Sequence, residues 1–221
     1  MNIKDLKEAQ VYAQRLGVKS LIYGPAGSGK TPVINTAPRP LLLATEPGLL
    51  SMRGSTVPTF IAPTGKDIDA FFLWFFSSNE TKNFDTLAID SGTQIAETFL
   101  KEAEKTNKHG LAAYGEANKN TLQHLEQLYF MPQKHIYLIA KQDSMADNTK
   151  RPYWPGRELP VKLAHMYDQI LHLDIHNVPG VGQVRSFQCG QTFDIMARDR
   201  TGILDIYEQP DFGKIVAKVM A

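Results

Sequence analysis

The chain has 221 residues and 43% hydrophobic content, which is enough to bury one sizeable core and favours a single domain over residues 1–221. Its 24 lysines and arginines nearly balance 23 aspartates and glutamates, so the overall charge gives no reason to expect a nucleic-acid or membrane partner. The single cysteine, Cys189, excludes an internal disulfide, no apolar run approaches the length of a membrane span, and a cytoplasmic location fits this composition.

Residues 1–17 are expected to form an amphipathic helix that ends at Gly17. Apolar residues recur there at helical spacing: Ile3, Leu6, Ala9, Ala13 and Leu16. Charged residues interrupt them, so the segment lacks the continuous apolar stretch of a signal peptide. Such a helix would cover the core or bind a neighbouring subunit, which makes it a candidate oligomerisation element.

Short apolar runs and amphipathic stretches alternate through the first two thirds of the chain. The runs at 20–23, 40–44, 86–89 and 135–140 predict buried strands, with 59–62 as a weaker candidate. Helices are predicted at 67–76, 93–105 and 115–130. This alternation predicts an α/β fold, with a mainly parallel sheet and helices on both of its faces.

The last third has a different pattern. Its apolar runs, at 169–175, 184–189, 193–197 and 203–207, are separated by turn residues and not by helices. We therefore expect C-terminal β-hairpins that extend the sheet, followed by a last helix at 211–220.

A glycine-rich segment directly follows the first predicted strand and matches G-x-x-x-x-G-K-[ST] in the strand, loop and helix context that this motif requires. Its residues are Gly24, Pro25, Ala26, Gly27, Ser28, Gly29, Lys30 and Thr31. The loop predicts a site for ATP and Mg²⁺, where main-chain N–H groups cradle phosphates, Lys30 reaches the β- and γ-phosphates, and Thr31 ligates the metal. The alternative is a chance glycine-rich turn. Pro32 comes next, which a first helical turn tolerates, and the helix must be short.

Two acidic residues follow later strands. Asp90 ends the apolar run 86–89 and is expected to hold Mg²⁺ through water, or alternatively to cap the helix that begins near Thr93. Glu46 ends the run 40–45 and is our candidate base, because a carboxylate at this edge could orient and deprotonate the attacking water. The alternative for Glu46 is an exposed loop residue.

Taken in order, these motifs resemble the RecA-like ATPase core, over about residues 20–207. They are most similar to the short phage-encoded RecA-like ATPases, AAA-like ATP-binding proteins of the single-strand annealing and recombination type. The resemblance rests on the glycine-rich loop, 44–48, Asp90 with Ser91, 139–142 and 198–202. It implies that Glu46 is catalytic, that Gln142 senses the γ-phosphate, and that Arg198 and Arg200 act as cationic fingers on a neighbouring subunit's nucleotide. The alternatives are an ordinary strand-end glutamine and two solvated hairpin arginines.

The resemblance also implies two single-stranded DNA segments. The first covers 101–114 and contains Lys101, Lys105, Lys108, His109 and Tyr114. The second follows Gln142 and contains Lys150, Arg151, Tyr153, Trp154 and Arg157. Cations interleaved with aromatics suit a single strand, because cations neutralise phosphates while rings stack on bases. The alternatives are a solvated helix end for the first segment and a proline-rich loop with locally packed aromatics for the second.

The expected function is therefore an oligomeric ATPase, a ring or filament, that binds single-stranded DNA and promotes annealing or recombination. Its expected setting is a host cytoplasm, with a single-strand-binding protein as a further partner. The alternatives are a P-loop kinase of a small molecule or nucleotide, and a regulatory ATP-binding loader or assembly factor. His172, Asp174 and His176 alternate at a spacing that could hold a metal, but a half-buried edge strand with a polar outer face explains them better.

Overall fold

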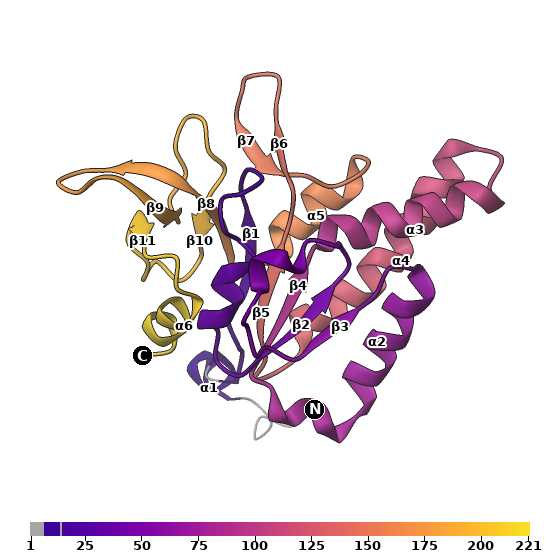
Figure 1. Ribbon diagram of the computed structural model, residues 1–221, viewed down its shortest axis with the longest axis horizontal. Helices are drawn as coiled ribbons and strands as arrows, with labels where there is room; N and C mark the ends of the chain where they lie inside the picture. Colours follow the sequence, from indigo (N-terminus) through magenta and orange to yellow (C-terminus); the bar gives the residue numbers. More distant parts are fainter. Residues whose placement is uncertain (1–6, 14) are drawn as a thin grey trace.

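The structure is a computed structural model that describes residues 7–13 and 15–221, and nine strands of this part form one sheet (Figure 1). Its parallel part has the order β3-β2-β4-β5-β1-β8. These strands are β3 (Thr59–Ile61), β2 (Pro40–Ala44), β4 (Thr86–Asp90), β5 (His135–Ile139), β1 (Lys19–Tyr23) and β8 (Gln169–Val178). The antiparallel strands β9 (Gly182–Gln188), β10 (Arg198–Asp199) and β11 (Tyr207–Glu208) extend it beside β8.

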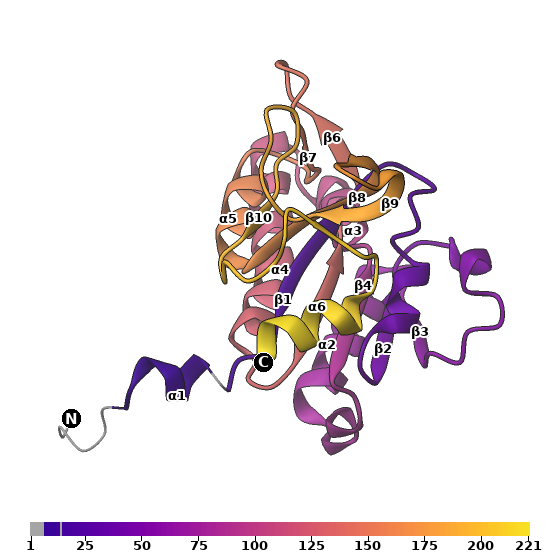
Figure 2. The same cartoon turned by 90° about the vertical axis from the view of Figure 1, so that its left-hand side faces the viewer.

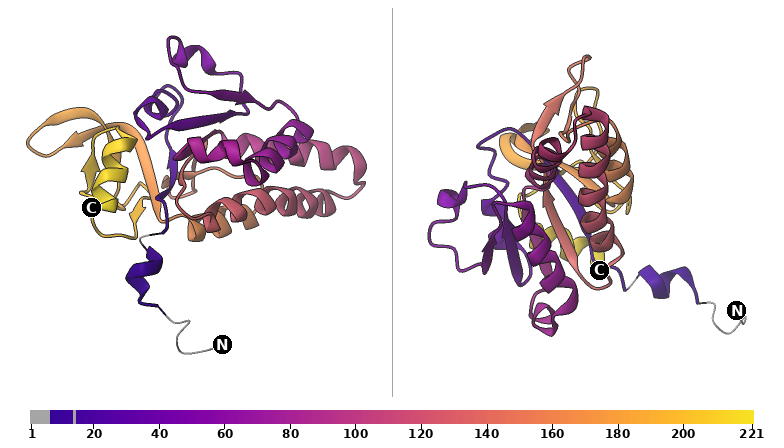
Figure 3. Two further views of the ribbon diagram at one scale, coloured as in Figure 1. Left: turned by 90° about the horizontal axis from the view of Figure 1, so that it is seen from below. Right: turned by 90° about the vertical axis from the view of Figure 1, so that its right-hand side faces the viewer.

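Helices cover both faces of the sheet, but unequally (Figure 3). One face carries α2 (Gly65–Ser77), α3 (Gly92–Thr106), α4 (Gly110–Phe130) and α5 (Glu158–Met166). The other carries the short 3-10 helix η2 (Pro32–Thr36) and α6 (Phe212–Met220), with Leu49 and Met52 packed beside them. Because successive side chains of a strand point to opposite faces, Leu87 and Ile89 pack under the larger helical layer while Ala88 packs under the smaller. Burial on both faces explains the continuous apolar runs of the central strands.

The mainly parallel sheet with helices on both faces and C-terminal antiparallel strands is confirmed. Two predicted strands are wrong: 193–197 makes a single bridge, between Ile195 and Lys150, and 203–207 contributes only its last residue to β11. For 203–207 the reason is a turn built by Asp199, whose carboxylate accepts the main-chain N–H groups of Thr201, Ile203 and Leu204. N–H groups that are bound to a side chain in this way cannot also pair with a neighbouring strand.

The N-terminal segment stands away from the sheet (Figure 2). Its helix α1 covers Ala9–Ala13, while the rest of the amphipathic helix expected over 1–17 falls partly on residues 1–6 and 14, outside the described residues. Within the part of the chain that the structure describes, no helix is long and apolar enough to cross a membrane. The remaining elements are a hairpin of β6 (Gln142–Ser144) and β7 (Lys150–Pro152), with the short helices η3 (Leu49–Met52) and η4 (Asn79–Asn83).

Candidate nucleotide-binding site

The glycine-rich loop leaves the carboxyl end of β1 and folds tightly against β8. A Cβ added to Gly24 would lie 2.1 Å from the main-chain oxygen of Leu173, so no side chain fits at this position. Gly27 and Gly29 have φ values of 79° and 96°, a region that L-residues with side chains rarely adopt. The local backbone therefore requires the glycines of the motif.

Lys30 points back into its own loop. Its Nζ donates hydrogen bonds to the main-chain oxygens of Gly24 and Pro25, both at 2.8 Å. Burial lowers the pKa of Lys30, while the negative charges of Asp90 and Glu46 act in the opposite direction. An ammonium group is therefore held where the phosphates of a nucleotide would lie in a loop of this type.

Thr31 and Asp90 meet beside the loop. The Thr31 hydroxyl donates to Oδ2 of Asp90 at 2.5 Å, although Thr31 directly precedes η2 and Asp90 ends β4. Burial raises the pKa of Asp90, and the hydrogen bond from Thr31 lowers it. A hydroxyl and a carboxylate side by side are oxygen ligands of the kind that Mg²⁺ takes together with phosphate oxygens, so the donor set fits this ion.

Glu46 is held from the neighbouring strand end. Its Oε1 accepts a hydrogen bond at 2.5 Å from the hydroxyl of Ser91, which in turn caps α3 by accepting the N–H of Gln94 at 3.2 Å. Lys141 approaches the same carboxylate at 3.8 Å and pairs more closely with Glu97, at 2.6 Å. Sequence reasoning gave no role to Lys141, although its place directly after the apolar run of β5 was a usable signal.

These side chains line one cavity of about 410 Å³ at the carboxyl edge of the sheet. Its lining residues are Gly24, Pro25, Ala26, Lys30, Glu46, Asp90, Ser91, Ile139, Ala140, Lys141 and Gln142. The structure therefore brings together four predicted residues, namely Lys30 from the loop after β1, Glu46 after β2, Asp90 at the end of β4 and Gln142 after β5. Ligands bind at this edge in open α/β sheets.

Gln142 joins the cavity to a buried row of polar side chains on β8 and β9. Its Oε1 lies 2.9 Å from Nε2 of His172, whose Nδ1 lies 3.0 Å from Nε2 of His176, and His176 reaches the Ser186 hydroxyl at 2.9 Å. Burial lowers the pKa of His172 to about 4. The edge-strand interpretation of these histidines is wrong, because β8 lies between β1 and β9 and both rings are buried.

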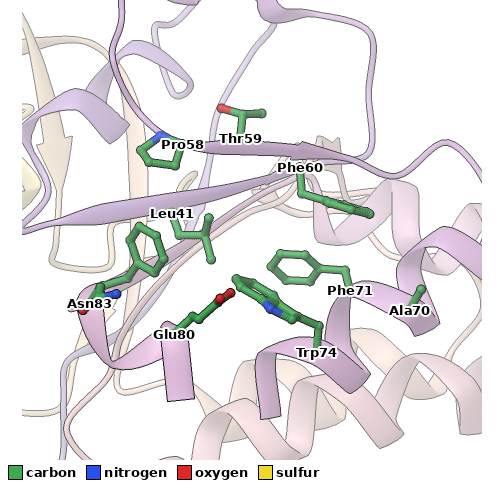
Figure 4. A pocket seen from close by; sticks show the side chains of 10 residues that line it. Leu41, Pro58, Thr59, Phe60, Ala70, Phe71, Trp74, Glu80 and Asn83 are labelled. Atoms are coloured by element: carbon green, nitrogen blue, oxygen red, sulfur yellow. The ribbon is translucent and has the colours of Figure 1, made fainter. Parts of the chain in front are cut away.

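A larger pocket of about 600 Å³ lies elsewhere, between β2, β3 and α2 (Figure 4). Its walls are mostly apolar and include Phe60, Phe71 and Trp74, and its charged lining residue is Glu80. A carboxylate among apolar walls disfavours a polyphosphate. The nucleotide site is therefore assigned to the smaller cavity beside the loop.

Arg198 and Arg200 do not lie at this cavity. Arg198 begins β10, which pairs with the beginning of β8, and Arg200 directly follows β10, so both lie at the amino edge of the sheet. The Arg198 guanidinium donates to the main-chain oxygens of Ala164 and Tyr167, and that of Arg200 to His165, all at the end of α5. The pair thus binds its own subunit in this structure, and its role on a neighbouring subunit stays a prediction.

The expected DNA segments are partly rearranged. Trp154 is 3% exposed and packs in the core, so its predicted stacking on a base is wrong. Arg151 pairs with Asp143 across the β6–β7 hairpin at 3.1 Å, Tyr153 is half-buried, and Arg157 is exposed. The stretch 101–114 is no loop, because α3 and α4 occupy most of it.

The sheet order together with the phosphate loop defines a RecA-like P-loop nucleoside triphosphatase fold. The chain belongs to the AAA domain family, whose profile matches residues 16–201 of its 221. A KaiC-like protein of the hyperthermophilic archaeon Pyrococcus horikoshii OT3 is similar at 14% identity and a TM-score of 0.44, over 78% of this chain and 77% of that one. Comparison with curated proteins found no match.

Proposed function

We propose that this chain binds ATP with Mg²⁺ at Gly24–Thr31 and hydrolyses its γ-phosphate bond. One observation carries the proposal: Lys30, Asp90 with its partner Thr31, and Glu46 lie around one cavity at the carboxyl edge of the sheet. Catalysis of phosphoryl transfer is mainly positioning and charge stabilisation, and these groups are of the types that it needs.

Each group has a distinct role in this proposal. Lys30 neutralises charge on the β- and γ-phosphates, and Thr31 and Asp90 would hold Mg²⁺, which neutralises the phosphate charge that develops during transfer. Glu46 orients the attacking water and accepts its proton, while its hydrogen bond from Ser91 fixes the carboxylate. Gln142 donates to the γ-phosphate, because its amide lines the same cavity.

The proposal extends to single-stranded DNA as the molecule to which hydrolysis is coupled. The β6–β7 hairpin begins at Gln142, on the cavity wall, and protrudes from the body of the protein (Figure 1). It carries Lys150 and Arg151, and Arg157 follows at the start of α5. Arg151 is paired with Asp143, but Lys150 and Arg157 make no ion pair within residues 7–13 and 15–221, and cations on or beside a projecting hairpin that begins at the cavity support DNA contact and a role in annealing or recombination as an oligomer.

Turnover of ATP, measured with and without single-stranded DNA, tests both parts. We expect DNA to raise the turnover of the wild-type chain and Lys30→Ala to abolish it. For the DNA part, the double variant Lys150→Ala/Arg151→Ala should lose DNA affinity and the salt dependence of binding. The double variant Lys66→Ala/Lys82→Ala is the matched control, because it removes the same charge from exposed positions on α2 and η4, outside both expected DNA segments.

The same assays separate the alternatives. Turnover that requires a small acceptor molecule would identify a kinase, and slow turnover that ignores DNA would favour a regulatory ATP-binding module. Calorimetry that detects no magnesium-dependent binding of ATP would overturn the proposal altogether.

A further inference from the structure

Arg185 lies beside the phosphate loop, which sequence reasoning missed. The β8–β9 hairpin extends beyond the end of β1, where Tyr23 pairs with His172, and Arg185 pairs with Ile175 in this extension. A Cβ on Gly29 would be 3.5 Å from Nη1 of Arg185 and 3.6 Å from its Cδ and Cζ. The register of β8 with β9 places this guanidinium against the phosphate loop. Because that register joins distant residues, no local sequence pattern could indicate the contact.

The Arg185 guanidinium is available for a ligand. The residue is exposed, and within residues 7–13 and 15–221 its side chain makes no hydrogen bond and no ion pair. By contrast, Lys141, which lines the cavity, is paired with Glu97, and Arg151 is paired with Asp143. Arginine binds phosphate well because its planar fork offers several donors at once.

The phosphate loop of this chain also lacks one donor. Pro32 follows Thr31 directly and has no main-chain N–H, so the row of N–H groups that continues through Gly29, Lys30 and Thr31 stops there. The helix that follows is a single 3-10 turn, Pro32–Thr36, which supplies less aligned dipole than the longer α-helix usual after such a loop. The loop therefore offers a phosphate one N–H donor and some helix dipole less than the motif usually provides.

We infer that Arg185 binds the α- or β-phosphate of the nucleotide held by its own subunit and replaces the donor that Pro32 removes. The inference rests on the proposed nucleotide site. The guanidinium lies over Gly29, in the part of the loop that cradles the α- and β-phosphates, whereas Lys30 serves the β- and γ-phosphates. Arg185 is thus a binding residue for diphosphate and triphosphate alike.

Calorimetry with Mg·ADP and with a non-hydrolysable Mg·ATP analogue tests this directly. Arg185→Ala should weaken the binding of both nucleotides by about tenfold or more, and by the same factor, because both carry the α- and β-phosphates. Arg15→Ala removes an exposed arginine at the amino edge and should change neither affinity. Thermal unfolding without nucleotide should be the same for the Arg185→Ala and wild-type chains.

A second substitution tests the compensation. Pro32→Ala restores the main-chain N–H, so Arg185→Ala should cost less affinity in that background than in the wild type. Excess Lys30→Ala chain, which carries an intact Arg185, should not restore binding to Arg185→Ala if the contact is made within one subunit.

The outcomes are distinguishable. Unchanged affinity for both nucleotides in Arg185→Ala overturns this inference and leaves the proposed function intact. A loss confined to the triphosphate analogue overturns the α- or β-phosphate assignment, and rescue by the Lys30→Ala chain overturns the assignment within one subunit. Absence of binding by the wild-type chain itself overturns the proposed function together with the inference.

Discussion

At both edges of the parallel sheet, cationic side chains donate hydrogen bonds to main-chain oxygens, but these contacts serve different purposes. At the amino edge, Lys19 is 1% exposed and its Nζ donates to the main-chain oxygens of Met131 and Lys134, while Arg198 donates to the end of α5. At the carboxyl edge, Lys30 also donates to two main-chain oxygens, but within a loop that faces a cavity. A cation bound to carbonyl groups therefore stabilises the fold at the amino edge and forms part of the candidate site at the carboxyl edge.

The neighbouring carboxylates explain the difference. Lys30 has Asp90 and Glu46 nearby, each from a different strand end and each fixed by a hydroxyl group. Burial lowers the pKa of Lys19 to about 8, and the charge of Asp168 opposes this only in part. Charges of both signs that converge on a cavity from separate elements indicate chemistry, whereas a cation that is enclosed by main chain indicates stability.

Among the variants that test the difference between the two edges, we expect the largest effect, a loss of ATP turnover, for Glu46→Gln. The glutamine keeps the shape of the Glu46 side chain but removes its charge. ATP turnover should fall by about 100- to 1,000-fold, because the attacking water loses its proton acceptor. Nucleotide affinity should remain within a few-fold, which calorimetry can check. Glu97→Gln is the control, because Glu97 pairs with the same Lys141 but does not line the cavity, and a loss of similar size in that variant would contradict the role of Glu46.

Much of the carboxyl edge was predictable from sequence. The phosphate loop is a local motif, and Glu46 and Asp90 each end a buried run, so parallel strands had to bring them to one edge. Arg185 was not predictable, since its place depends on the register of β8 with β9.

The amino edge and the basic segments were less predictable. Interleaved cations and aromatics look alike in sequence whether they face solvent or core, and only the packing of α5 and α3 shows that Arg198 is tied to α5 and that Trp154 is buried. The strand expected at 203–207 failed for a similar reason, because one carboxylate, that of Asp199, takes up three main-chain N–H groups.

A smaller effect separates the two arginines of the amino edge. Arg198→Met should lower the free energy of unfolding by about 1–3 kcal/mol, because the buried carbonyl groups of Ala164 and Tyr167 lose their donor. Arg200→Met should cost less, since the Arg200 side chain is 37% exposed. Chemical denaturation measures both variants.

Turnover then decides whether either arginine also acts on a neighbouring subunit. A loss of turnover in Arg200→Met with nucleotide affinity preserved would support a finger, and mixing it with Glu46→Gln should then restore some activity. Equal destabilisation by both variants, with normal turnover of each folded protein, would make the pair purely structural.

The smallest expected effect concerns pH. The pKa of His172 is lowered by burial to about 4 in the folded chain, against an ordinary value near 6.5, so the unfolded state binds more protons between these values. The stability that depends on neutral His172 is fully present above about pH 6.5 and is lost as the pH falls toward 4. Linkage gives a loss of about 1 kcal/mol between pH 7.5 and 5.5 from this group.

Denaturation at the two pH values, in the wild-type chain and in His172→Gln, measures this loss. The glutamine cannot take up a proton, so the variant should lose less stability on acidification, although His176 and His135, whose pKa values burial also lowers, keep part of the dependence. An identical pH dependence in both chains would contradict a neutral, buried His172. His172 would then keep an ordinary pKa, and at pH 5.5 a charged ring would lie 2.9 Å from the Gln142 amide oxygen, behind the nucleotide cavity.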